Sequence, residues 1–153
     1  NMHDLIAIRN RRDLAGLLQK LDAEKIAIWG KMKPQQMIEH LITEVQYTNG
    51  KRDPFCEIPE EEARLAKQEH LHSDTEMPRN LVLGEIPSEL TCANLPTAIQ
   101  QLMTELDDFD DYFRNQGTQA IHGFFGPMNY QEWVIWHSKH FTHHLKQFGL
   151  IDV

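Results

Sequence analysis

Apolar side chains recur at the three- and four-residue spacing of an amphipathic helix through most of this 153-residue chain. Such spacing puts them on one face of a helix, and that face has to be buried against another element. The segments that show helical spacing or helix signals are 10–21, 34–50, 60–71, 94–115 and 129–149. No segment alternates convincingly as a strand would, so the sequence predicts an all-α domain that spans residues 1–153.

Residues typical of helix ends indicate where the predicted helices begin and end. Pro34 suits the first turn of a helix, Asn49-Gly50 suits its end, and Asn129 suits the N-cap of the last helix. Residues 73–96 contain three prolines and a glycine, which predicts an ordered loop, and residues 117–127 predict a crossing rich in turns. We therefore expect a four-helix bundle with one long decorated connection.

The composition excludes several classes of partner. The formal net charge of −8 repels phosphate groups, so we expect no nucleic-acid partner. No apolar run approaches the ~20 residues that span a bilayer, and the first residues lack the pattern of a signal peptide. Cys56 and Cys92 stand 36 positions apart without a disulfide or metal spacing, which indicates reduced thiols. These features predict a cytoplasmic protein that associates with no membrane.

Histidines gather in the last predicted helix. Four of the nine lie between positions 137 and 144. Each residue turns a helix by about 100°, so His140 and His144 project from the same face, one turn apart. Two imidazoles at this spacing can bind one metal ion without distorting the backbone. His137 falls within the same sector, whereas His143 points about 100° away.

A third ligand has to come from another helix, and His40 is the natural choice. It lies at the edge of the apolar stripe of the second predicted helix. Three neutral imidazoles and water would form an open site, as in catalytic metal centres. Imidazole ligands alone do not select among Zn²⁺, Ni²⁺, Fe²⁺ and Mn²⁺.

Two further residues could take part in chemistry. Glu44 lies four positions after His40 and could orient an imidazole, act as a general base, or be an ordinary solvated glutamate. His137 could be a fourth ligand, a proton shuttle with a pKa near ~6.5, or a residue that lines the pocket. The aromatic residues of the last segment fit core packing better than substrate stacking; they are Trp133, Trp136, Phe141 and Phe148.

The sequence resembles a known superfamily at two places. Residues 33–41, KPQQMIEHL, resemble the second-helix motif of the DinB-like bundle superfamily. Residues 123–128, GFFGPM, then Glu132-Trp133, then residues 139–149, KHFTHHLKQFG, are similar to one of its subfamilies, DUF1569. With the helix order between them, the two motifs cover most of the chain. Relatives in that subfamily tend to have His-Pro where this chain has His122-Gly123.

The resemblance implies a fold and a metal site. DinB-like proteins are four-helix bundles, often dimeric, so a homodimer is one implied form. They bind a divalent metal through one histidine on the second helix and a pair on the fourth. At the matching positions of this chain, the implied metal ligands are His40, His140 and His144.

Three functions follow as hypotheses, each with a small-molecule ligand. Characterised DinB-like enzymes include transferases that use a low-molecular-weight thiol such as bacillithiol, mycothiol or glutathione, so the resemblance implies a metal-dependent S-transferase first. A metal-dependent hydrolase is the second, since a bound ion also lowers the pKa of water. The third is a protein that binds a metal or small ligand without turnover.

Overall fold

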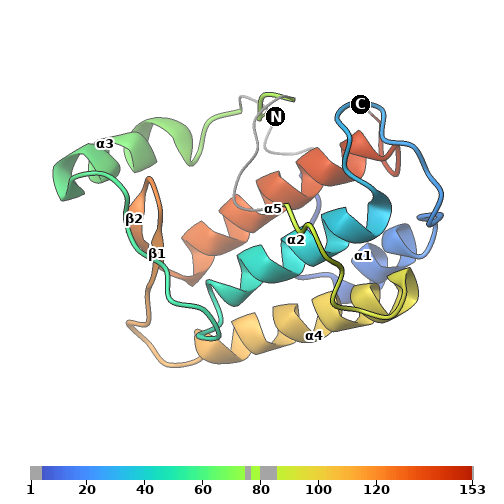
Figure 1. Cartoon of the computed structure of the whole chain (residues 1–153). Helices are drawn as coiled ribbons and strands as arrows, with labels where there is room; N and C mark the ends of the chain where they lie inside the picture. Colours follow the sequence, from blue (N-terminus) through green and yellow to red (C-terminus); the bar gives the residue numbers. More distant parts are fainter. Residues whose placement is uncertain (1–4, 75–76, 80–85, 153) are drawn as a thin grey trace.

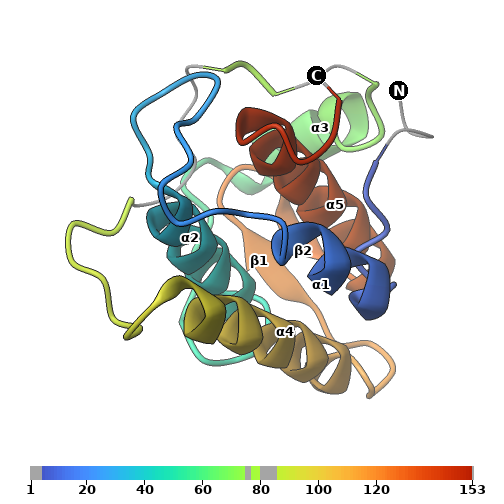
Figure 2. The same ribbon diagram turned by 90° about the vertical axis from the view of Figure 1, so that its right-hand side faces the viewer.

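The computed structural model describes residues 5–74, 77–79 and 86–152, and it is mostly helical (Figure 1). Its helices are α1 (Arg11–Leu18), α2 (Pro34–Gln46), α3 (Glu60–His70), α4 (Leu95–Tyr112) and α5 (Tyr130–Gln147). Two short strands, β1 (Ala120–His122) and β2 (Gly126–Met128), form a hairpin between α4 and α5. Helix α2 packs against both α4 and α5, whereas α3 stands to one side against the hairpin (Figures 1 and 2).

The helix starts follow local hydrogen bonding. The Asn129 side chain accepts from the Glu132 N–H at 2.9 Å, and Glu132 Oε1 accepts in return from the Asn129 N–H at 3.0 Å. This reciprocal cap satisfies two N–H groups of the first turn that have no partner within the helix. It confirms the predicted cap of the last helix. Asn94 caps α4 in the same way through the Thr97 N–H, at 2.9 Å.

The predicted helices are present, but three of them end about three residues earlier than expected. Helix α1 ends at Leu18 rather than at residue 21, α2 ends at Gln46 rather than near residue 49, and α4 ends at Tyr112 rather than at residue 115. In each case the chain continues in a turn, and helix ends are where the apolar spacing carries the least information.

The core lies between α1, α2, α4 and α5. The predicted stripe of α2 is fully included, since its apolar members are at most 5% exposed; they are Met37, Ile38, Leu41, Ile42 and Val45. Burying one such side chain stabilises the fold by about 1.5–3 kcal/mol.

Helical spacing in segment 60–71 predicts a small buried face made of Ala63, Leu65, Ala66 and Leu71. Ala63 and Leu71 are buried, but Leu65 is 45% exposed. That prediction was wrong because α3 packs mainly against the hairpin and contacts α5 through polar groups, such as the Lys67–Glu132 ion pair, so less of its surface is buried.

The hairpin corrects the expectation that the chain has no strands. Ala120 pairs with Met128 and His122 with Gly126, in antiparallel register. Gly126 has a φ of 72°, a conformation that other residues rarely adopt. The Trp133 indole donates to the Ala120 carbonyl at 2.9 Å, which ties the hairpin to α5. Strands of three residues are too short for alternation to be visible in the sequence.

A buried carboxylate fixes part of the predicted loop 73–96, of which residues 75–76 and 80–85 lie outside the described residues. Glu39 Oε1 accepts from the Thr91 N–H at 2.7 Å and Oε2 accepts from the Cys92 N–H at 3.2 Å. Burial alone would raise the pKa of Glu39, but these hydrogen bonds outweigh it and lower the pKa. The carboxylate therefore holds the end of the loop against α2.

The structure agrees with the all-α class in being mostly helical, and the small hairpin is its only departure within the described ranges. The more specific four-helix bundle of the DinB-like type stays a prediction. None of the helices in the described part of the chain combines the length and the apolar character needed to cross a bilayer.

Candidate metal centre

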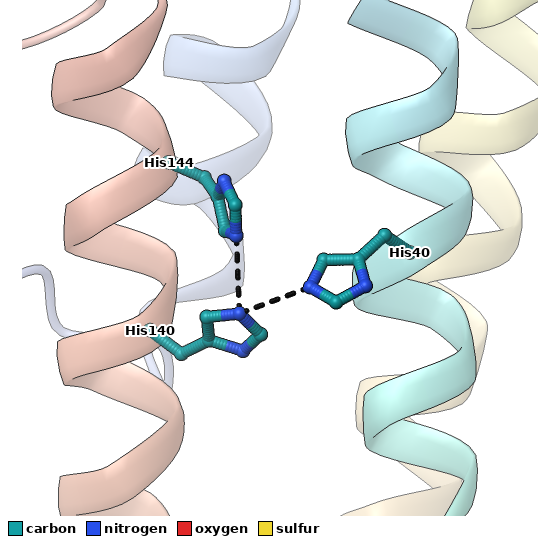
Figure 3. Close-up of side chains that lie close together, drawn as sticks. All are labelled: His40, His140 and His144. Atoms are coloured by element: carbon teal, nitrogen blue, oxygen red, sulfur yellow. Dashed lines mark hydrogen bonds between the residues drawn. The ribbon is translucent and has the colours of Figure 1, made fainter. Parts of the chain in front are cut away.

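Three histidines meet between α2 and α5, and Figure 3 shows their rings turned toward one another. His140 Nε2 lies 3.1 Å from His40 Nε2 and 3.0 Å from His144 Nε2. One nitrogen from each ring falls within 4.8 Å of the others. His40 and His140 are 1% exposed and His144 is 6% exposed. The structure thus brings together the three residues that the sequence suggested as ligands.

The helices themselves explain this convergence. His140 and His144 occupy successive turns of α5, so both rings leave the helix on the side that faces α2. His40 lies within the buried stripe of α2, between Glu39 and Leu41, and faces α5 from the opposite side. Packing of α2 against α5 therefore closes the cluster.

The spacing suits a metal ion. Nitrogens bound to one zinc ion lie about 2.0–2.1 Å from it, so neighbouring ligands are roughly 2.9–3.4 Å apart. Two of the three distances in the cluster, 3.1 and 3.0 Å, fall in this range, and the third is no longer than 4.8 Å. Moreover, His140 Nε2 has two nitrogen neighbours but can carry one proton at most. A single N–H cannot serve both contacts equally, whereas a cation between the rings would accept a lone pair from each of them.

Burial keeps two of the three rings, those of His140 and His144, neutral. It lowers the pKa of His144 to about 3, against the opposing hydrogen bond to Gln147, and it lowers the pKa of His140 well below its ordinary value. Nearby histidines lower both further. Neutral imidazole is the form that binds metals, so at neutral pH neither ring has to lose a proton before it can act as a ligand.

Gln147 fixes the orientation of one ring. Its Nε2 donates to the Trp29 carbonyl at 3.1 Å, which leaves its Oε1 to accept from His144 Nδ1 at 2.7 Å. The proton of His144 is therefore on Nδ1, and the Nε2 lone pair points into the cluster. Metal-bound histidines commonly have such an acceptor on the second nitrogen. Gln147 was not predicted to take part in the site, although its position three residues after His144 places it on the same side of α5.

Trp136 covers another ring of the cluster. It stacks on His140 with ring centroids 5.9 Å apart and an interplanar angle of 25°. The sequence suggested core packing for Trp136, but this side chain is half-buried and also lines a cavity beside the cluster. Its spacing of four residues from His140 was the available signal.

His137 lies in the core rather than in the cluster. Its side chain is 0% exposed, and Nε2 lies 3.0 Å from the hydroxyl of Thr48. That hydroxyl donates to the Val45 carbonyl at 2.7 Å, so it accepts from His137. The ring stacks on Trp133 at 5.2 Å and meets the edge of Phe109 at 5.2 Å. Burial, with a smaller effect of His122, lowers the pKa of His137 to about 3.

Glu44 is a half-buried carboxyl one turn along α2 from His40. Burial raises its pKa to about 7, although the charge of Arg52 acts in the opposite direction. A fully solvated glutamate would not show this shift. Glu44 lines the same cavity as Trp136. Groups with a pKa near neutrality suit proton transfer, which keeps Glu44 a candidate base.

His122 and His143 complete the neighbourhood. His122 is buried in the hairpin, and its Nδ1 accepts from the N–H groups of Phe124 and Phe125 at 3.0 and 3.1 Å. Burial lowers its pKa to about 4. His143 is half-buried beside Trp29, with ring centroids 5.4 Å apart. Neither belongs to the three-histidine cluster.

Comparison with known proteins identifies a family. The family model described as "Protein of unknown function (DUF1569)" matches residues 63–149, from α3 to the end of α5. The matched region contains His140 and His144 but not His40. No curated protein and no solved structure gives a significant match. The wider DinB-like resemblance stays a prediction. Since the match covers more than half of the chain, this protein belongs to the DUF1569 family.

Proposed function

We propose that this protein is a metal-dependent enzyme whose divalent ion, Zn²⁺, Ni²⁺, Fe²⁺ or Mn²⁺, is held by His40, His140 and His144. The supporting observation is the convergence of three buried Nε2 atoms, two pairs of which are 3.1 and 3.0 Å apart, with too few protons to satisfy one another. Three ligands leave a position open for a substrate atom. A bound ion would supply Lewis acidity, which lowers the pKa of water or of a thiol.

Two reaction classes fit such a site. The resemblance implies transfer to or from a low-molecular-weight thiol, a reaction that needs no additional protein base. Hydrolysis of a small molecule requires a base to take the proton of the attacking water. Glu44, with its pKa raised to about 7 by burial, is the specific observation that favours this second class. A protein that binds metal without turnover is the remaining alternative, and a homodimer stays a prediction.

Metal content tests the site directly. Wild-type protein loaded with Zn²⁺ and desalted is compared by elemental analysis with His40→Ala, His140→Ala and His144→Ala. His143→Ala is the matched control, because it removes a histidine of the same helix that lies outside the cluster. We expect near-equimolar metal in the wild type and control, and loss in the other three. Wild-type protein that retains no metal after loading would overturn the proposal.

The Glu44→Gln variant separates the two reaction classes. It keeps the shape of the side chain but cannot accept a proton at neutral pH. If hydrolysis is the activity, the loaded variant should retain its metal and lose about 10²–10⁴-fold in rate on ester and amide substrates. Thiol transfer, if that is the activity, should be nearly unchanged by the same substitution.

A further inference from the structure

A cavity of about 240 Å³ opens beside the three-histidine cluster, between α2, the segment 54–57, the hairpin and α5. Trp136 is common to both places, since its ring lines the cavity and stacks on His140 at 5.9 Å. The cavity therefore lies one aromatic ring away from the candidate metal site. A volume of this size fits a small organic molecule.

The walls of the cavity are mainly aromatic. Trp133 and Trp136 form the side contributed by α5, and Tyr47 adds a ring from the end of α2. At the rim, Phe55 is 71% exposed and Phe124 is 47% exposed. Large aromatic side chains gathered around a cavity and left open to solvent commonly mark a binding site.

The charge of the cavity is negative. Its acidic lining groups are the carboxyls of the half-buried Glu44 and the exposed Glu57, and none of the described lining residues is lysine or arginine. With a pKa of about 7, Glu44 is ionised in about half of the molecules at neutral pH, and a bound cation would favour its ionised form. Arg52 is the cationic group whose charge lowers the pKa of Glu44. Its guanidinium donates from Nε to Gln46 Oε1 at 2.9 Å and lies 6.0 Å from the centre of the Tyr47 ring. Arg52 therefore acts on Glu44 through space, while its own contacts are with other residues.

His122 does not offset this charge. It lines the cavity as a neutral ring, because its Nδ1 accepts two backbone N–H groups and burial disfavours its protonated form. Gly123, the next residue, leaves room for the second carboxylate: a Cβ atom at this position would lie 3.1 Å from Glu57 Oε2.

We propose that this cavity binds a small organic ammonium ion, with its charged head between the carboxylates and the aromatic rings and its apolar part against the tryptophans. The negative faces of aromatic rings attract cations, and tryptophan does so most strongly. Binding of the ammonium ion does not depend on the metal. That the ammonium compound is the substrate of the enzyme rests on the proposed function.

Ligands of one shape and different charge test the charge preference. The probes are choline and 3,3-dimethylbutylamine as cations, 3,3-dimethylbutan-1-ol as the neutral analogue and 3,3-dimethylbutanoate as the anion, titrated into wild-type protein while tryptophan fluorescence is recorded. We expect at least one cation to bind tenfold or more tighter than the alcohol, and the anion to bind more weakly still. Equal affinities for the three charges, a preference for the anion, or no binding would each overturn the proposal.

Variants assign the effect to the cavity. Glu44→Gln should reduce the affinity for the preferred cation about tenfold and leave the affinity for the alcohol unchanged, with Glu62→Gln on the exposed face of α3 as the matched control. If Glu44→Gln does not fold, as judged by circular dichroism, Phe124→Leu at the rim provides the second variant with the same expectation. An unchanged cation preference in a folded variant overturns the assignment.

One further measurement keeps this proposal distinct from the metal site. The same titrations are made with His140→Ala protein, which should lack metal. Retained binding of the cation supports the cavity whether or not the metal proposal holds. Loss of cation binding in folded His140→Ala would overturn the proposal that binding is independent of the metal.

Discussion

Two buried histidines on adjacent turns of α5, His137 and His140, have different partners. His137 donates to the Thr48 hydroxyl at 3.0 Å and packs among aromatic rings, so its proton has a fixed place. His140, one turn later, faces two other imidazole nitrogens at 3.1 and 3.0 Å through its Nε2. The Nδ1 atoms of both rings have no partner among the described residues, so the two histidines differ at Nε2. Both rings are buried to a similar degree. Burial alone therefore does not identify a ligand; the partners of the ring nitrogens do.

A similar contrast separates the carboxylates of α2. Glu39 is surrounded by donors, and its pKa is lowered despite burial. Glu44 lies five residues further along and lines a cavity, and burial raises its pKa to about 7. The first is suited to holding a loop, and the second is suited to meeting a ligand or a proton. Both proposed roles of Glu44, base and partner of a cation, require its ionised form.

Metal binding should give the largest effect. At a Zn²⁺ concentration about 1,000 times Kd, a ligand that binds only the folded state adds roughly 4 kcal/mol to the free energy of unfolding. For a chain of this size, that corresponds to an increase in Tm of about 10 °C. We expect this increase, measured by differential scanning calorimetry, in the wild type and not in His140→Ala. An equal increase in Tm in both proteins would mean that His140 is not needed for metal binding, and the contrast between His137 and His140 would be lost.

Truncation of His137 should lower the stability of the fold and leave metal binding unchanged. His137→Ala leaves a cavity between Phe109 and Trp133 and removes the donor to Thr48, so we expect a loss of about 3 kcal/mol in the free energy of unfolding. Bound metal should stay near one equivalent in the fraction that remains folded. Urea unfolding and elemental analysis measure the two quantities. Loss of the metal from folded protein would make His137 part of the site.

Gln147 tests how strongly the orientation of a ligand matters. Gln147→Leu removes the acceptor of the His144 Nδ1 proton at similar size, so we expect the affinity for Zn²⁺ to fall 10- to 100-fold. Competition with a chromogenic chelator measures this change. Gln119→Leu, at an exposed glutamine outside the cluster, serves as a control for glutamine replacement. Unchanged affinity in Gln147→Leu would mean that helix packing alone positions the ring.

The smallest expected effect is on the pH dependence of stability. The pKa of His137 is about 3 in the folded protein and near 6.5 in the unfolded chain. Between these values the unfolded chain binds a proton that the folded protein does not, so stability is full above pH 6.5 and falls as the pH decreases toward 3. Each such histidine contributes a slope of about 1.4 kcal/mol per pH unit.

His137→Phe removes one titrating group and keeps an aromatic ring. Its free energy of unfolding, followed by urea titration of metal-free protein between pH 7 and pH 5, should fall less steeply than that of the wild type, by about one proton's slope at the acid end. Identical slopes in the two proteins would show that His137 is already protonated, or already neutral in both states, over this range.

Much of the fold was present in the sequence. Apolar spacing located the helices, and Asn129 and Pro34 marked where two of them begin. The hairpin was not predicted, because strands of three residues carry too little pattern to be recognised. The exposure of Leu65 was not predicted either, since it depends on α3 packing mainly against the hairpin.

Residue spacing is enough to place His140 and His144 on one helix face, because the geometry of a helix depends only on spacing. Three contacts depend instead on the packing of the helices: His40 meets this pair, Gln147 fixes the proton of His144, and His137 donates to Thr48. The cavity around Glu44 likewise requires α2, the hairpin and α5 to come together. Contacts between segments distant in the chain depend on how whole helices pack, and local spacing does not contain that information.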